Sequence, residues 1–344
     1  MENKKEGRIF QYDLMRFLFM LMVLGVHVLS VSKQFSEEYN TTWIITTIFT
    51  DLFLICNPLF FMLSGRFNLK KEFNTKEDYK KFYIKRIVTL LVPFLIFSIV
   101  IYIYCNFNNL NIINFLKGLL AGNIEGTYWF VYTLLGIMIF SPFFSKMLKN
   151  MNLFEKKLFF IISFCINTFI TIFAVFKIPN MITFNIVGLV HWNSYYLMGE
   201  YIEEIFSTRK SRKIIMLIGL LAFVLQFILR CTIKTGYRLS DPSPLLTLQA
   251  LALYFLVLEF VKIKNEKVKN VISYFSKYSY IFYLLHMTVI HFVNNFFNMY
   301  INAGLNAVFA LCIFIISFII TMCIAIVAEK FVIKPIQNFL LRWR

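Results

Sequence analysis

The sequence has few acidic residues, few histidines and no clustered cysteines. Among 344 residues, 18 Asp and Glu stand against 35 Lys and Arg, and there are four His. The six cysteines are scattered, mostly inside apolar stretches, without the C-x-x-C or C-x-x-H spacing of redox and zinc motifs. We therefore expect no disulfide framework and no bound metal, and we interpret the cysteines as small apolar side chains.

The chain also lacks stretches typical of a soluble domain, a linker or a leader. It has no low-complexity segment and no inverted repeat of the kind common in secondary transporters. The longest expected loops, 66–85, 106–127 and 232–243, are too short to fold alone. The first apolar run is too long for a cleavable signal peptide and contains two charges. We expect one domain over residues 1–344, without a fused soluble domain.

Apolar residues dominate the composition. The chain is 59% hydrophobic and 19% aromatic, and its mean hydropathy is +0.69. These values predict an all-α integral membrane protein, and the apolar runs suggest about ten membrane-spanning helices. The predicted spans are 9–32, 42–64, 86–105, 128–145, 157–176, 184–203, 213–231, 244–261, 278–297 and 304–328.

The distribution of Lys and Arg predicts the orientation. If the N-terminus is cytosolic, 28 of the 35 cations fall in segments expected inside and six in segments expected outside, while Arg16 lies within the first span. This positive-inside asymmetry predicts an even number of spans and both termini in the cytosol. It also accounts for the net charge of +17 without nucleic acid, and it would attract anionic lipid headgroups or an anionic cytosolic ligand.

The first apolar run contains Asp13, Arg16 and His27 where hydrocarbon is expected. Ionisable groups inside a membrane span are costly and by default indicate a functional site. Arg16 and His27 are 11 residues apart, three helical turns plus about 20°, so they share one face. Asp13, three residues before Arg16, is its natural charge partner, but it is about 20 Å from His27 along the helix. A membrane-edge ion pair plus a packing histidine is the structural alternative.

Basic residues flank the second and third spans at the expected inner face. Ser64 and Gly65 are predicted to end the second span, and Arg66 follows. Lys85 and Arg86 lead into the third span. Two adjacent cations suit a pyrophosphate or phosphate ester, with interfacial anchoring as the alternative.

Two acidic residues and one tryptophan are further candidates for binding an acceptor. Asp51 lies about nine residues into its span and is expected to pair with Arg16 or to line the acceptor cavity. Glu125 precedes Trp129 on the expected outer side, and a carboxylate beside an aromatic face suits a sugar. A solvated loop acid is the more common situation for a residue such as Glu125.

Six motifs occur along the chain, one per segment. They are D-L-M-R at 13–16 with His27 after ten intervening residues, P-L-F-F-M-L-S-G at 58–65, F-Y-I-K-R-I-x-x-L-L-V-P at 82–93, Y-W-F-V-Y-T-L-L-G-I at 128–137, Y-Y-L-M-G-E-Y at 195–201 and Y-S-Y-I-F-Y-L-L-H at 278–286. In this order the chain resembles the bacterial membrane acyltransferase-3 family, the polysaccharide and peptidoglycan O-acyltransferases. Each motif alone is weak, but together they cover nearly the whole chain.

The resemblance implies a bacterial cytoplasmic-membrane enzyme that moves an acyl group, usually acetyl from cytosolic acetyl-CoA, to a sugar hydroxyl at the outer face. It implies a catalytic His27 and an Arg16 needed for activity, and it places Lys85 and Arg86 at the position of the family's basic motif. We hypothesise that Lys85, Arg86, Arg66 and Ser64 bind the donor and hold its phosphates. The acceptor would be an envelope glycan or a lipid-linked saccharide. Acyl-CoA would act as a co-substrate, and no cofactor would be bound permanently.

The residues support acyl transfer less specifically. A histidine near neutral pKa can take the proton of a sugar hydroxyl or carry the acyl group, and Asp13 would compensate Arg16. No Ser-His-Asp arrangement is visible. His286 and Tyr283 belong to the last motif, and His286 suits a structural hydrogen bond and a substrate pathway equally well.

A transporter or flippase of an amphipathic envelope precursor, or an assembly protein without acyl transfer, is the alternative to an enzyme. Polar stripes and basic inner loops serve those functions as well. Direct transfer or an acyl-enzyme, acetyl or a longer acyl group, and a monomer or a homo-oligomer are left open. Membrane lipids are the expected surroundings.

Overall fold

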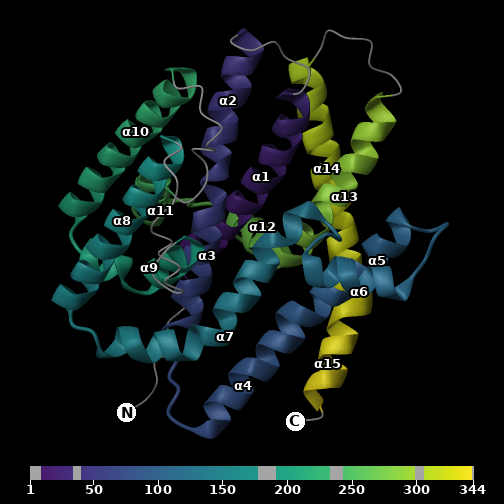
Figure 1. Cartoon of the computed structure of the whole chain (residues 1–344), viewed down its shortest axis with the longest axis horizontal. Helices are drawn as coiled ribbons and strands as arrows, with labels where there is room; N and C mark the ends of the chain where they lie inside the picture. The colour runs from purple at the N-terminus through teal and green to yellow at the C-terminus, as the bar shows by residue number, and fades with distance from the viewer. Residues whose placement is uncertain (1–8, 34–39, 177–190, 233–242, 299–305, 343–344) are drawn as a thin grey trace.

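The computed structural model describes residues 9–33, 40–176, 191–232, 243–298 and 306–342, and in these residues it contains helices and no strand. The predicted all-α class is confirmed. The first helix, α1 (Phe10–Lys33), agrees closely with its predicted span and lies at the centre of the molecule (Figure 1). Since it contacts helices from both halves of the chain, its polar side chains can meet residues distant in sequence.

The second predicted span is divided into α2 (Thr41–Leu54) and α3 (Cys56–Asn68). Pro58 has no backbone N–H to donate to the carbonyl four residues earlier, which explains the break at this point. The helix does not end at Ser64 and Gly65 as predicted, because α3 continues for one more turn. That additional turn brings Asn68 to the candidate site described below.

Two glycines bring α3 and α9 (Trp192–Ile205) into close contact. A Cβ atom on Gly65 would lie 1.7 Å from the carbonyl oxygen of Tyr196, and one on Gly199 would lie 1.9 Å from that of Met62. Neither position has room for a side chain. The C-terminal part of α3 is therefore fixed against α9 by backbone contact.

The inner loop predicted at 66–85 is mostly helical, and that prediction was wrong. After α3 only residues 69–75 form a turn, and α4 (Lys76–Arg86) begins with a capping box between Thr75 and Asp78. The charged composition of α4 suggested a loop, although Thr followed three residues later by Asp is a helix-start signal. The helix continues through a π-helical turn, Ile87–Leu91, into α5 (Val92–Cys105). Pro93 lacks the N–H that a regular turn needs at this point, which explains the widened turn.

Helices also occur in two further segments predicted as loops, where α6 and α12 form. The remaining elements are α6 (Ile112–Ala121), a 3₁₀ turn (Gly126–Tyr128), α7 (Trp129–Asn150), α8 (Leu153–Val175), α10 (Arg209–Thr232), α11 (Pro244–Glu259), α12 (Glu266–Ser276), α13 (Ser279–Asn298), α14 (Asn306–Ala328), a π-helical turn (Glu329–Ile333) and α15 (Lys334–Arg342). Of the predicted span 184–203, the part before residue 191 lies outside the described residues.

Within the described residues, seven helical stretches are long and apolar enough to cross a membrane. They are Phe10–Ser30, Thr41–Asn68, Lys76–Cys105, Gly126–Asn150, Leu153–Phe173, Arg209–Thr232 and Phe309–Arg342. The chain is thus a multi-pass membrane protein, while the number ten and the cytosolic termini stay predictions. Helices α9 and α11 have 14 and 16 residues, fewer than the roughly 20 that a span needs.

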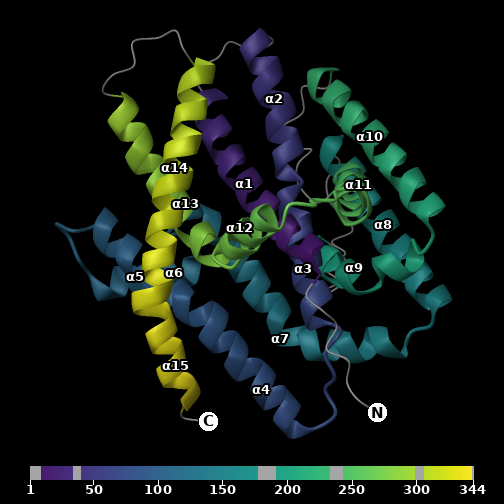
Figure 2. The same cartoon turned by 180° about the vertical axis from the view of Figure 1, so that it is seen from behind.

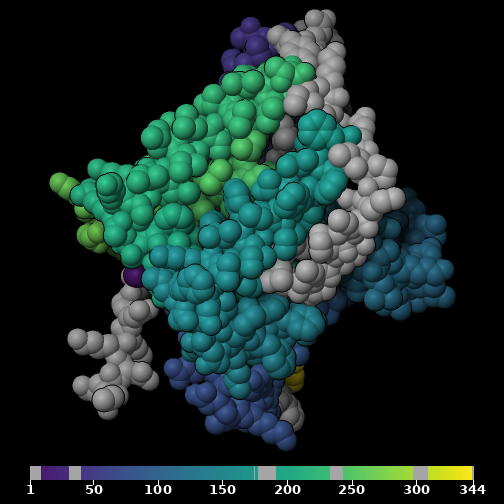
Figure 3. All heavy atoms as spheres, turned by 60° about the vertical axis from the view of Figure 1, so that its left-hand side comes forward, coloured from purple at the N-terminus to yellow at the C-terminus, as the bar shows by residue number. Residues whose placement is uncertain are grey.

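The exposed surface of the helices is strongly apolar, as expected against lipid. Figure 3 shows α8 and α10 covering one side of the molecule, and α10 exposes Leu217, Leu220 and Leu221 there. Seen from behind, α12 crosses α1, and α14 runs along the adjacent side (Figure 2). Asp13 and His27 of α1 therefore face neighbouring helices, α12 and α13.

Candidate active site

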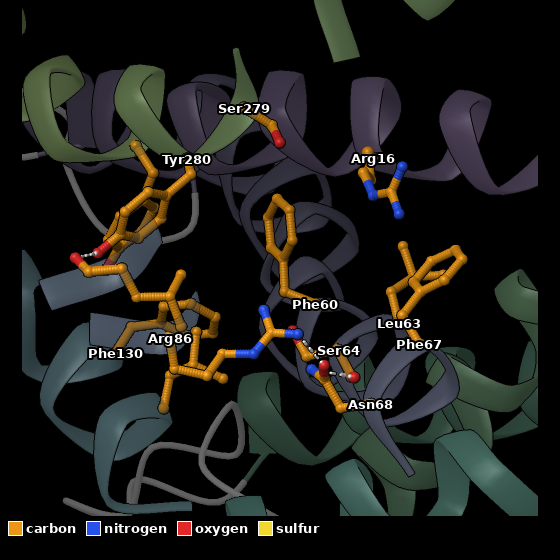
Figure 4. Close-up of a pocket in the computed structure, with 13 residues that line it drawn as sticks. Arg16, Phe60, Leu63, Ser64, Phe67, Asn68, Arg86, Phe130, Ser279 and Tyr280 are labelled. Carbon is orange, nitrogen blue, oxygen red and sulfur yellow. Dashed lines mark hydrogen bonds between the residues drawn. The ribbon is translucent and has the colours of Figure 1, made fainter. Parts of the chain in front are cut away.

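A cavity of about 220 Å³ lies beside α1, between α3, the α4–α5 helix, α7 and α13. Four of the predicted site residues line it: Arg16, Ser64, Arg86 and Tyr283. Figure 4 shows Arg16 projecting from α1 on one side and Arg86 on the other, with the ring of Phe60 between them. Packing thus brings two guanidinium groups from separate helices to one cavity.

Arg16 is held by a carboxylate and an aromatic ring. Its Nη1 lies 3.0 Å from Asp13 Oδ1, and its guanidinium carbon lies 4.4 Å from the centre of the Phe67 ring. Asp13 is buried and also accepts a hydrogen bond of 3.0 Å from the Ser273 hydroxyl on α12. The predicted Asp13–Arg16 pair is confirmed. It fixes the guanidinium at the cavity wall, where the Arg16 side chain keeps 31% exposure.

Arg86 reaches the cavity from α4. Its Nη2 donates a hydrogen bond to Asn68 Oδ1, and its guanidinium carbon lies 5.2 Å from the centre of the Phe82 ring. Its Nε is buried and has no hydrogen-bond partner among the described residues. The neighbouring Lys85 is exposed and does not line the cavity, because successive helical residues point about 100° apart. Of the predicted pair Lys85 and Arg86, only Arg86 therefore lines this cavity.

Arg66 lies in a different cluster, contrary to its predicted place beside the donor phosphates. Its Nη2 is 3.1 Å from Glu203 Oε2, and its Nε donates to the Tyr12 hydroxyl at 2.9 Å. Glu203 Oε1 also accepts hydrogen bonds from Tyr12 and Tyr254, at 2.8 and 2.5 Å. This network joins α1, α3, α9 and α11, so the charge of Arg66 is compensated away from the cavity.

The two histidines of the first and last motifs meet inside the structure. The ring centres of His27 and His286 are 5.1 Å apart. His286 is fully buried, and its Nδ1 lies 2.5 Å from the carbonyl oxygen of Tyr283. That carbonyl can only accept, so we assign the proton to Nδ1, which leaves a lone pair on Nε2. Nε2 has no partner among the described residues.

Tyr283 connects this histidine pair to the cavity. Its ring lines the cavity and lies 5.2 Å from the His286 ring. Its hydroxyl donates to the backbone carbonyl of Thr127, in the 3₁₀ turn before α7. Along α1, Arg16 and His27 are about 16 Å apart. The site is therefore elongated, with guanidinium groups at one end and imidazoles at the other.

The predicted carbohydrate residues occupy the α7 end near that 3₁₀ turn. The Trp129 side chain is 38% exposed, and its ring centre lies 5.0 Å from that of Trp192 on α9. Glu125 is half-buried immediately before the turn. Trp192 was not singled out from the sequence, because no spacing relates it to Trp129. An aromatic pair at this end of α7 agrees with the predicted sugar-binding chemistry without testing it.

Asp51 pairs with Arg230, and the expectation that it pairs with Arg16 was wrong. The Nη2 atom of Arg230 on α10 lies 2.7 Å from Asp51 Oδ1, and the Asp51 side chain is 1% exposed. Asp51 does not line the cavity beside α1. Because α10 packs next to α2, Arg230, which was predicted to lie in an outer segment, forms the ion pair with Asp51.

Comparison with known proteins assigns the chain to a family. Residues 9–328 match the family model described as an acyltransferase domain, the acyltransferase-3 model. The match runs from α1 to the end of α14, so it contains both histidines and every residue of the cavity. No curated protein and no solved structure matches the chain.

Proposed function

The chain belongs to the acyltransferase-3 family, and we propose that it transfers an acyl group, usually acetyl, from cytosolic acyl-CoA to a hydroxyl of an envelope polysaccharide or lipid-linked sugar. The observation that carries the proposal is the contact of His27 with the buried His286, linked through Tyr283 to a cavity lined by Arg16 and Arg86. Histidines and guanidinium groups serve the two different parts of such a donor.

The length of the site suits acyl-CoA. Phosphates bind well to guanidinium groups, through charge-assisted hydrogen bonds in a matching geometry. His27 lies about 16 Å along α1 from Arg16, so one ligand can engage both only if its anionic and reactive ends are far apart. Acyl-CoA has this form, because a long arm separates its phosphates from the thioester. We assign the phosphates to the cavity and the thioester to His27.

In the proposed reaction His27 is the general base. Its imidazole takes the proton of the acceptor hydroxyl while the hydroxyl oxygen bonds to the thioester carbon. The carbon–sulfur bond then breaks, and the proton passes from His27 to the leaving thiolate. The lone pair on His286 Nε2 is available to stabilise His27 while His27 is protonated. The acceptor sugar is assigned to the side of Trp129, Trp192 and Glu125.

The test replaces the base and measures transfer. His27→Ala should lower acetyl transfer by about 10²–10⁴-fold, the usual contribution of a general acid or base. Glycan-bound acetate is measured in cells at matched amounts of membrane protein, and thiol release from acetyl-CoA is measured with purified protein. Near-normal acetate in His27→Ala cells would reject the enzyme and favour a transporter of an amphipathic precursor.

A further inference from the structure

At the C-terminal end of α3, the side-chain oxygen of Asn68 accepts hydrogen bonds from two cations, Lys71 and Arg86. Asn68 Oδ1 accepts a hydrogen bond of 2.8 Å from Lys71 Nζ and another from Arg86 Nη2. The Asn68 amide nitrogen donates to the Ser64 carbonyl at 2.8 Å, which directs the oxygen toward the cations. Asn68 is 4% exposed. One buried amide oxygen therefore provides the polar contact for two positive charges.

The surroundings do not supply the missing negative charge. Among the described residues, neither Lys71 nor Arg86 forms an ion pair with a carboxylate within 4.0 Å. The acid next to Lys71, Glu72, is exposed and approaches Lys149 at 3.9 Å. Lys85 adds a further positive charge on α4. Lys71 and Arg86 are half-buried, and a cation partly removed from water without a counter-charge is costly, so this cluster is suited to a bound anion.

The cluster is also held in place before any ligand arrives. The Ser145 hydroxyl on α7 lies 2.7 and 2.8 Å from the backbone carbonyls of Leu69 and Lys71. Leu69 is fully buried, which anchors the turn. The Phe82 ring lies 5.2 Å from both Lys71 Nζ and the Arg86 guanidinium carbon. Binding would therefore require little ordering of these side chains.

Burial and the charges of Arg86 and Lys85 lower the pKa of Lys71 to about 7. Lys71 lies in the turn between two spanning stretches, outside both. On the elements packed against this turn, the other titratable groups are Lys146 on α7 and Tyr79 on α4, which contact each other, and the exposed Lys149–Glu72 pair. Tyr196 on α9 interacts with Arg86. Near neutral pH, Lys71 is thus only partly charged until an anion offsets its cationic neighbours.

We propose that Asn68, Lys71 and Arg86 form a phosphate-binding subsite at one end of the cavity. A negative charge bound beside Lys71 favours its protonated form, so binding should be accompanied by proton uptake. Asn68 and Arg86 line the cavity, and Lys71 extends the site from the adjoining turn. For acyl-CoA as the source of the phosphate, this inference rests on the proposed function. An anionic lipid headgroup has the same chemistry, and the experiment separates the two.

The experiment titrates CoA into the purified full-length chain in phosphatidylcholine nanodiscs between pH 7 and 8.5, where phosphates are almost fully ionised. Wild-type affinity should fall as pH rises and Lys71 loses its proton, by at most about tenfold per pH unit for one linked proton. Lys71→Met should weaken binding at pH 7 by roughly tenfold, the effect of losing a charged hydrogen bond. Lys71→Arg should bind without the pH dependence. Lys80→Met, which removes an exposed cation of α4, is the matched control.

A second measurement follows phosphatidylglycerol retained by the protein after purification from mixed vesicles. If Lys71→Met reduces CoA binding, the subsite holds the donor, and if it reduces only lipid retention, the subsite holds a headgroup. If Lys71→Met binds CoA as tightly as the wild type at every pH and retains the same amount of lipid, the subsite is overturned and the proposed function still stands. Absence of CoA binding to the wild type would reject the donor, while lipid retention would still test the subsite.

Discussion

Replacing His286 tests whether the histidine pair acts as a unit. His286→Phe keeps a planar ring in a fully buried position but removes both ring nitrogens. The carbonyl of Tyr283 loses its hydrogen bond from Nδ1, and His27 loses the lone pair of Nε2 beside it. The first loss should lower the free energy of unfolding by about 1–3 kcal/mol. The second should slow transfer.

The expected size of the rate effect follows from the chemistry of that contact. A hydrogen bond to a charged group is worth about 1.5–3 kcal/mol, so stabilising a protonated His27 corresponds to roughly 10–150-fold in kcat. The KM for acetyl-CoA should change little, because His286 does not line the cavity to which we assign the phosphates. Tyr283→Phe is a useful comparison, since it keeps the backbone carbonyl bound to His286 and removes only the hydroxyl contact with Thr127.

The assay is the initial rate of thiol release from acetyl-CoA by purified protein, with the acceptor saturating and the folded fraction measured on the same sample. A kcat for His286→Phe within threefold of wild type would refute the reasoning. So would a rise in KM alone, which would place His286 at the donor site rather than beside the base.

Three further outcomes are expected. Arg16→Lys keeps the charge beside Asp13 but loses the planar fork, so KM for acetyl-CoA should rise about tenfold, and an unchanged KM would remove Arg16 from donor binding. Arg230→Met removes the partner of the buried Asp51 carboxylate and should lower the free energy of unfolding by about 3 kcal/mol, measured by thermal unfolding. The double variant with Asp51→Asn should regain most of this stability. If it does not, the ion pair contributes little. A single cysteine at the exposed Asn74, in a chain otherwise free of cysteine, should resist an impermeant reagent in intact cells and react in inverted vesicles, and external labelling would refute the predicted orientation.

Local pattern determined part of the structure. The helical class and the extent of α1 follow from runs of apolar residues, which must satisfy their backbone groups internally in lipid. The pair of Asp13 and Arg16 follows from their three-residue spacing on one helix. Local composition misled at α4, where many charges suggested a loop despite a helix-start signal at Thr75.

Only the tertiary structure decided which distant groups meet. Arg66 pairs with Glu203 and Asp51 with Arg230, although spacing along the chain favoured neither pair. A charge inside the membrane is costly without a partner, so the sequence indicated that Asp51 is paired, but helix packing determined that its partner is Arg230.

The same distinction holds for the site. The sequence marked His27 as a group out of place in hydrocarbon, but its contact with His286 depends on how α13 packs against α1. The partnership of Asn68, Lys71 and Arg86 likewise depends on how α3, the turn after it and α4 fold together. Periodicity and hydropathy are properties of a single helix, so they determine which face a residue occupies. The position of a residue on a neighbouring helix is set by packing, and that packing formed the cavity.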